Sequence, residues 1–133
     1  MRTCAKAPCK TCPYRKDVPS GVWAQEEYDK LKTYDGEVFE QLEKGALGRF
    51  DCHQRDGMMC AGWIATHGPQ NLLALRVDAA NIAPEVWNYK SPVPVFGSGA
   101  EAAKHGVRDI KRPGADARNA INRLIRKRNR NGW

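Results

Sequence analysis

The spacing of the cysteines constrains this chain more than any other feature. Cys9 and Cys12 form a C-x2-C pair, while Cys52 and Cys60 lie much further along, with seven residues between them. The C-x2-C spacing lets two thiolates converge on one metal, and two more cysteines complete a set of four soft ligands. The sequence therefore predicts a zinc or iron-sulfur centre held by these four residues. Cys4 is left over and is interpreted as a bystander that is able to replace one ligand.

The wide spacing of the second pair bears on the kind of metal centre. Structural zinc sites usually use two closely spaced pairs, whereas a cubane cluster is larger and tolerates irregular spacing. Pro13 follows Cys12, as in the Cys-Pro ending of ferredoxin motifs, although the rest of that motif is missing. We therefore favour an iron-sulfur cluster of the 4Fe-4S type, with zinc as the alternative. Residues suited to shield a cluster from water flank the second pair: Phe50, Met58, Met59 and Trp63.

Two other interpretations of the cysteines are less favoured. Free cysteine is often buried as a small hydrophobic residue, but charged residues such as Lys10, Asp51 and Arg55 surround these positions. Thiol-disulfide exchange at the C-x2-C pair would place a cysteine after a strand and at the start of a helix. No strand-like segment precedes Cys12. A metal centre remains the leading prediction.

Length and cysteine number indicate one domain in a reducing compartment. A chain of 133 residues fits a single domain with a modest core. Its opening, MRTCAKAPCK, lacks the apolar run of a signal peptide, and no stretch approaches the roughly 20 apolar residues that span a bilayer. The odd number of cysteines is typical of ligands rather than disulfides. We expect a cytoplasmic protein that does not bind membranes.

The positive charge is concentrated at the C-terminus. Residues 111–133 hold eight of the 22 basic side chains and one of the 15 acidic ones, so all of the net charge of +7 lies there. Such a segment attracts polyanions, of which nucleic acid is the commonest in the cytoplasm. The alternative is a solvated charged face on a packed helix, and Trp133 either stacks on a base or anchors the terminus. The candidate nucleic-acid-binding residues are Arg118, Arg123, Arg126, Lys127 and Arg130.

The apolar periodicity predicts a mainly α fold with long ordered loops. Residues 1–20 are expected to form an ordered loop, and the prolines of residues 91–96 predict an extended segment. We expect a small four-cysteine metal-binding domain in residues 1–110, with residues 111–133 as a basic amphipathic helix packed on it or extending from it. Helices are predicted after Ser20 and over residues 37–44, 60–67, 70–77, 84–89, 98–106 and 113–130.

Several side chains are assigned to the inner faces of these helices. Val38, Phe39 and Leu42 are predicted to point inward, and the C-terminal helix is expected to use Ile125 on its apolar side. Ser98 and Glu101 have capping-box spacing. Glycines following histidines predict two helix ends, at His67-Gly68 and at His105-Gly106.

Three motifs in the first half of the chain carry a family resemblance. They are CKTCPYRKD at residues 9–17, FDCHQRD at residues 50–56 and CAGW at residues 60–63. The chain thereby resembles a domain-of-unknown-function family of small proteins from actinobacteria and their phages, with the pattern C-x2-C-P-aromatic-R, F-x-C-H and C-A-G-aromatic. The resemblance implies that Cys9, Cys12, Cys52 and Cys60 act as a set. It implies no activity, and the basic tail lies outside the motifs.

The remaining candidates surround the predicted ligands. Arg15 is expected to donate to sulfurs or to pair with a nearby aspartate, and His53 is assigned a place beside the ligands, because adjacent residues rarely both bind one ion. Trp63 is expected to shield the centre. No set of nucleophile, base and acid is evident. We therefore expect a non-enzymatic, regulatory or redox-sensing protein, and a cluster-dependent or thiol-dependent enzyme is the further alternative.

Overall fold

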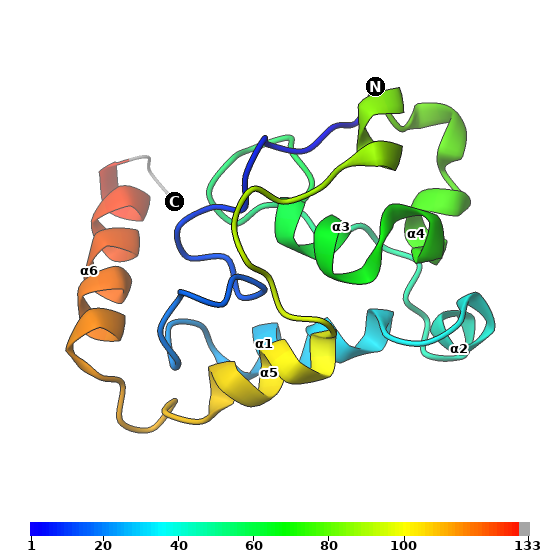
Figure 1. Cartoon of the computed structure of the whole chain (residues 1–133). Coiled ribbons are helices and arrows are strands. Elements are labelled where there is room, and N and C mark those ends of the chain that lie inside the picture. The colour runs from blue at the N-terminus through cyan, green and yellow to red at the C-terminus, as the bar shows by residue number, and fades with distance from the viewer. Residues whose placement is uncertain (131–133) are drawn as a thin grey trace.

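The computed structural model describes residues 1–130 of the chain as helices and ordered loops (Figure 1). Within these residues there is no strand, and extended segments meet only at isolated bridges. The mainly α fold with long loops is therefore confirmed. The α-helices are α1 (Gln25–Leu31), α2 (Val38–Glu43), α3 (Ala61–His67), α4 (Leu73–Arg76), α5 (Gly99–Val107) and α6 (Ala115–Arg130); the 3₁₀ turns are η1 (Lys32–Tyr34), η2 (Pro69–Asn71), η3 (Ala79–Asn81) and η4 (Pro84–Asn88).

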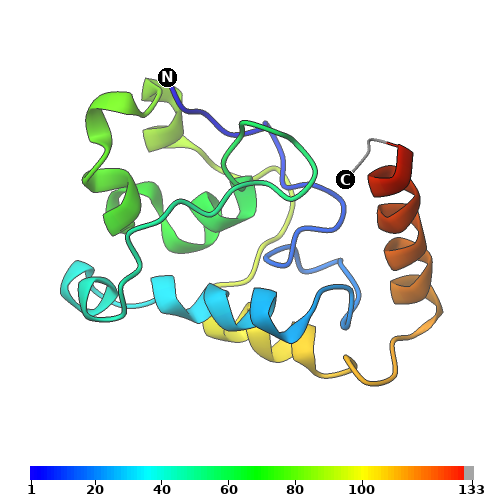
Figure 2. The ribbon, with the colours of Figure 1, turned by 180° about the vertical axis from the view of Figure 1, so that it is seen from behind.

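The N-terminal loop lies at the centre of the arrangement. In both Figure 1 and Figure 2 it runs between α6 on one side and α3 on the other, while α1 and α5 lie side by side below it. Its backbone is held by later segments, because Met59 N–H donates to Thr3 O and Phe96 N–H donates to Tyr14 O, both at 2.9 Å. Residues 1–20 contain no helix, as expected, and the 91–96 segment is extended beside them.

Two helices begin at a side-chain N-cap, of which the one at Ser98 was predicted from its capping-box spacing. Cys60 is the N-cap of α3, and its sulfur accepts a hydrogen bond from Trp63 N–H at 3.4 Å. Ser98 caps α5 by accepting from Glu101 N–H at 3.1 Å. Gly68 ends α3 with a φ of 80°, a backbone conformation that glycine adopts without strain. These local signals were sufficient to place both helix starts.

The prediction for α2 was wrong about its inner face. Phe39 is 67% exposed and Leu42 is 53% exposed, whereas Gln41 is completely buried. The Gln41 amide donates to two backbone carbonyls, at 3.1 and 2.6 Å, and its oxygen accepts from Leu73 N–H at 3.0 Å. Because all of these groups are satisfied, burying the amide carries little penalty. The helix is thus docked through a polar side chain that an apolar pattern does not register.

Helix α6 packs on the N-terminal loop through its small apolar side chains. Ala117, Ala120 and Leu124 are buried in the common core, as the amphipathic pattern predicted. Ile125 is 49% exposed, so its assignment to the apolar side was wrong. Residues 131–133, including Trp133, lie outside the described residues. No helix of the described chain has the length and apolar character to span a membrane.

Gly106 was predicted to end α5, but the helix continues to Val107. A Cβ at Gly106 would lie 2.1 Å from Cε1 of Tyr28 on α1, so this glycine permits close helix packing.

We expect Gly106→Ala to lower the free energy of unfolding by about 3 kcal/mol through overpacking, although alanine favours an isolated helix. Urea unfolding measures the effect. Gly114→Ala is the control, because its Cβ would meet nothing within 4 Å, and equal stability of the two variants would contradict this role.

Candidate metal centre

The fold brings the four predicted cysteines together from three separate parts of the chain. The sulfurs of Cys12 and Cys60 are 3.6 Å apart, and the pKa of the Cys9 thiol is raised most by its interaction with Cys52. The two pairs also influence each other: charge on Cys52 raises the pKa of Cys12, and charge on Cys9 raises the pKa of Cys60. Cysteines that are far apart in the sequence are thus brought near one another as two pairs, beside the start of α3.

The sulfurs are arranged as two close pairs. Within residues 1–130, no group of three or more His, Cys, Asp or Glu side chains is positioned to hold a metal ion. Cys4 forms an isolated bridge with Met59, the residue before Cys60, and among residues 1–130 its thiol has no hydrogen bond to another cysteine. Burial and the charge of Glu85 raise the pKa of the Cys4 thiol to about 11, which disfavours the thiolate that a metal requires.

Hydrogen bonds stabilise negative charge on one sulfur of each pair. A hydrogen bond from the Cys9 thiol, together with the N–H groups of Gln54 and Arg55, lowers the pKa of Cys52 to about 5 against the effect of burial. A hydrogen bond from the Cys60 thiol lowers the pKa of Cys12, and backbone N–H groups act in the same direction. Both positions therefore favour the thiolate.

The partner sulfur of each pair retains its proton. Donation to Cys52 and burial raise the pKa of the Cys9 thiol, and burial and donation to Cys12 raise that of Cys60. A cation placed between the pairs would replace these protons, because metal ligands bind as thiolates. Thiols are the donors that both zinc and iron-sulfur clusters use, and in residues 1–130 the two pairs would have to move closer together to surround one centre.

A close approach between α3 and the C-x2-C loop depends on Gly62. A Cβ at this position would lie 2.5 Å from Cys12 Sγ and 2.9 Å from Cβ of Tyr14. The absence of a side chain therefore makes room for the Cys12 sulfur next to the helix that begins at Cys60. The family pattern contained this glycine, but its spacing gave no indication of what it contacts.

The three residues predicted beside the ligands have different contacts. Arg15 Nε lies 2.7 Å from Asp17 Oδ1, and its Nη1 donates to Pro8 O at 2.9 Å, so it clamps the loop around the first cysteine pair. His53 Nε2 lies 2.8 Å from a carboxylate oxygen of Glu27. Trp63 is completely buried, and in the described part of the protein its indole N–H has no hydrogen-bond partner.

A buried network behind the cysteine loop was missed by sequence reasoning. The Tyr14 hydroxyl lies 3.0 Å from His67 Nε2, and His67 Nδ1 lies 3.4 Å from Asp35 Oδ1. A proton on Nδ1 satisfies both contacts, because Nε2 then accepts from the tyrosine. Asp35 also accepts from Gly99 N–H at 2.7 Å, at the start of α5. The network ties the loop after Cys12 to α3 and α5, and no local pattern links residues so far apart.

His67 is expected to make stability depend on pH. Burial lowers its pKa to about 4, although the charge of Asp35 opposes the shift. Between pH 6.5 and 4 the unfolded chain binds a proton at this histidine that the folded protein does not. The free energy of unfolding therefore decreases as the pH is lowered through this window. Glutamine does not titrate, so in His67→Gln the decrease in the free energy of unfolding between pH 6.5 and 4 should be smaller by roughly 3 kcal/mol. Urea unfolding at several pH values checks this, and equal pH slopes for both proteins would contradict it.

The predicted nucleic-acid residues are divided between two sides of α6. Arg123, Arg126 and Lys127 line a cavity of about 880 Å³ between α6 and the cysteine loop. Arg118 is exposed but does not line this cavity. Arg130 ends α6, and its side chain lies outside what the structure describes. The helix therefore presents only some of its arginines toward the candidate metal centre.

Comparison with known proteins gives one match. A model of a family of unknown function, DUF6283, matches residues 4–128 and thus covers all five cysteines and nearly all of α6. No curated protein and no solved structure matches the chain. The match includes most of the basic helix α6, whereas the three sequence motifs all lie in residues 9–63. The chain belongs to the DUF6283 family.

Proposed function

We propose that this protein binds an iron-sulfur cluster, of the 4Fe-4S type, through Cys9, Cys12, Cys52 and Cys60. The proposal is supported by the 3.6 Å approach of the Cys12 and Cys60 sulfurs, with Cys9 and Cys52 close enough to shift each other's pKa. Backbone N–H groups directed at cysteine sulfurs are typical of cluster sites, where they tune the potential. We further propose a non-enzymatic, regulatory or redox-sensing role, because loss of the centre would release the loops that it holds.

The surroundings of the thiols support a cluster over a single ion. Phe50, Met59 and Trp63 are each at least 95% buried and form an apolar wall on the side of the second pair. Such a wall limits access of water, and solvent exposure is one of the determinants of cluster potential. The separation of Cys52 from Cys60 also lacks the tight pairing usual in structural zinc sites.

Zinc is the second candidate, and one distance favours it. Two thiolates bound tetrahedrally to one zinc ion at about 2.3 Å lie about 3.8 Å apart. The 3.6 Å separation of the Cys12 and Cys60 sulfurs is close to that value. A zinc-stabilised interaction module would use the same four residues.

The basic helix supports a role in binding nucleic acid or a partner associated with it. All of the net charge lies in residues 111–133, and several of its cations face a cavity instead of being dispersed over the surface. Binding of this kind depends strongly on salt, because each phosphate contact releases counterions. We therefore propose nucleic acid as the partner.

Anaerobic purification followed by metal and sulfide analysis tests the cluster. The proposal predicts a brown protein with a broad absorption band in the visible range and with iron and acid-labile sulfide in equal amounts. A colourless protein with stoichiometric zinc would establish the second candidate instead. A metal-free protein that unfolds at the same temperature with and without added iron, sulfide or zinc would contradict both.

A further inference from the structure

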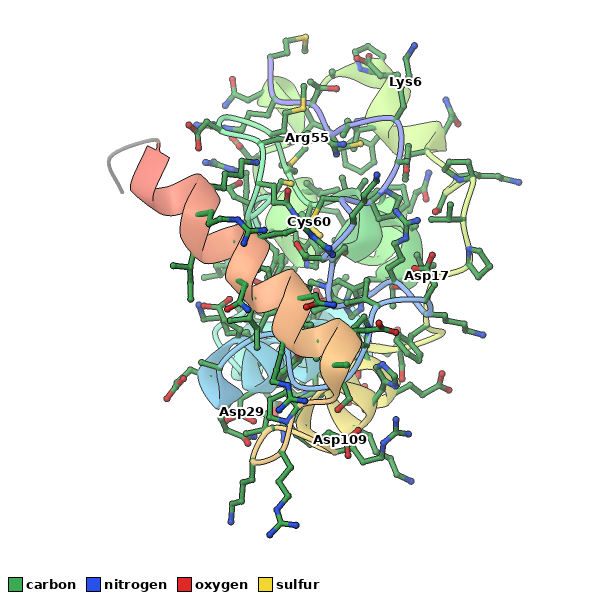
Figure 3. The ribbon with its side chains drawn as sticks, turned by 90° about the vertical axis from the view of Figure 1, so that its left-hand side faces the viewer. Lys6, Asp17, Asp29, Arg55, Cys60 and Asp109 are labelled. Carbon is green, nitrogen blue, oxygen red and sulfur yellow. The ribbon has the colours of Figure 1, made fainter. Side chains whose placement is uncertain are left out.

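The 880 Å³ cavity between α6 and the N-terminal loop is built partly from the metal-binding segments themselves. Two of its lining residues, Lys10 and Thr11, are the residues between Cys9 and Cys12. A third, Gln54, follows Cys52 by two positions. Figure 3 looks onto α6 from this side, with Cys60 behind the helix. The shape of the cavity therefore depends on the loops that the metal centre would hold.

The cavity is strongly electropositive. Lys10, Arg123, Arg126 and Lys127 line it, and no carboxylate does so among the residues that the structure describes. Within residues 1–130, none of these four cations takes part in an ion pair. Four cations around one hollow raise the local concentration of anions, while Lys10 and Arg123 also line a neighbouring hollow together with Asp17 and Asp116. Together with the Thr11 and Gln54 side chains, which are able to donate hydrogen bonds, the four cations suit phosphate groups.

A chain of hydrogen bonds joins the basic helix to the first cysteine. Lys127 Nζ donates to Gln54 O at 3.0 Å and lies 3.4 Å from its side-chain oxygen. The Gln54 amide in turn donates to the Thr11 hydroxyl, which lies 3.8 Å from the Cys9 sulfur. The position of α6 is thus fixed by residues adjacent to two of the proposed ligands.

From this arrangement we infer that the cavity binds the phosphodiester backbone of a nucleic acid and that the metal centre keeps it in the binding form. The inference rests on the proposed function and assigns its binding site and its regulation. Loss of the metal would allow Thr11 and Gln54 to move. These two residues line the cavity together with Arg123 and Arg126, so the cavity would lose its binding shape. Metal occupancy and nucleic-acid affinity are then thermodynamically linked.

Fluorescence anisotropy tests the site with labelled 20-nucleotide single-stranded DNA, single-stranded RNA and duplex DNA, each titrated at several salt concentrations. Arg123→Gln should weaken binding about fivefold to eightfold at 0.1 M salt and lower the salt slope by about one, as expected for a lost phosphate contact. The three probes show which nucleic acid supplies the phosphates. Unchanged metal content and melting temperature confirm that the variant is folded.

Arg118→Gln is the matched control, because it removes the same charge from the same helix. Arg118 and Arg123 are five residues apart, or about 140° around the helix axis, and only Arg123 lines the cavity. Arg118→Gln should therefore change the affinity less than twofold. Equal losses of affinity in the two variants would overturn the site, because they would show that the nucleic acid is attracted only by the net charge of the helix.

The link to the metal centre is tested by the same titration on metal-loaded protein and on protein treated with a chelator. Removal of the metal should weaken binding about fivefold or more, within the usual range of coupling between sites. Identical affinities would overturn the regulation. A metal-loaded wild type that binds none of the three probes would contradict the proposed nucleic-acid function, and the inference with it.

Discussion

Cys12→Ser is expected to abolish the metal centre. Cys12 is almost completely buried, accepts a hydrogen bond from Cys60 and is a favoured thiolate. Serine removes a soft ligand, and the remaining three thiols do not complete a tetrahedral site. A complete structural centre contributes on the order of 10 kcal/mol to folding, so its loss should lower the melting temperature by roughly 10 °C or more. Metal analysis and thermal unfolding of anaerobically purified protein measure both effects.

Cys4→Ser provides the control for Cys12→Ser. Cys4 is half-buried, and burial and the charge of Glu85 raise the pKa of its thiol to about 11, which disfavours its use as a thiolate ligand. Its replacement should leave the metal content intact and change the free energy of unfolding by less than about 1 kcal/mol. If both variants retained metal, or both lost it, the division between four ligands and one bystander would be wrong.

Gly62→Ala is expected to damage the site without changing a ligand. The new Cβ would lie 2.5 Å from Cys12 Sγ, so either the C-x2-C loop or α3 must move. Alanine in place of glycine would otherwise stabilise a helix by about 1 kcal/mol, which makes a loss easy to interpret. We expect retention of metal under chelator challenge to fall about tenfold or more, as for other changes beside metal ligands.

A matched glycine separates this effect from a general response to alanine. Gly48 has ordinary backbone angles, and a Cβ there would meet nothing within 4 Å. Gly48→Ala should therefore bind metal and unfold like the wild type. Full metal retention and full stability in Gly62→Ala would show that the close approach to Cys12 has no role in the site.

The parts of the fold set by local chemistry could be predicted from the sequence. The α3 helix starts at Cys60 and ends at Gly68 as expected, because an N-cap and a glycine with positive φ act within a few residues. The same applies to the Ser98 cap of α5. The choice of Cys9, Cys12, Cys52 and Cys60 as one ligand set stays a prediction; the structure brings the sulfurs of Cys12 and Cys60 to 3.6 Å.

The failures concern contacts between distant segments. The inner face of α2 was missed because Gln41 is held by carbonyl groups and an N–H from residues 36, 71 and 73, which no hydrophobic period reveals. Gly106 was interpreted as a helix end, whereas the ring of Tyr28 requires its lack of a side chain. The relay from Lys127 through Gln54 to Thr11 likewise joins three remote segments. Such tertiary contacts have no local signature in a single sequence.

X-ray absorption at the iron and zinc edges of anaerobically purified protein shows which metal the thiolates bind and which atoms surround it. If four thiolates hold an iron-sulfur cluster, iron will be present with sulfur as its sole neighbouring ligand type and with further iron atoms at short range. Zinc with sulfur ligands alone would keep the four-cysteine site but reject the cluster. Metal bound through oxygen or nitrogen, and unaffected by Cys12→Ser, would contradict the account.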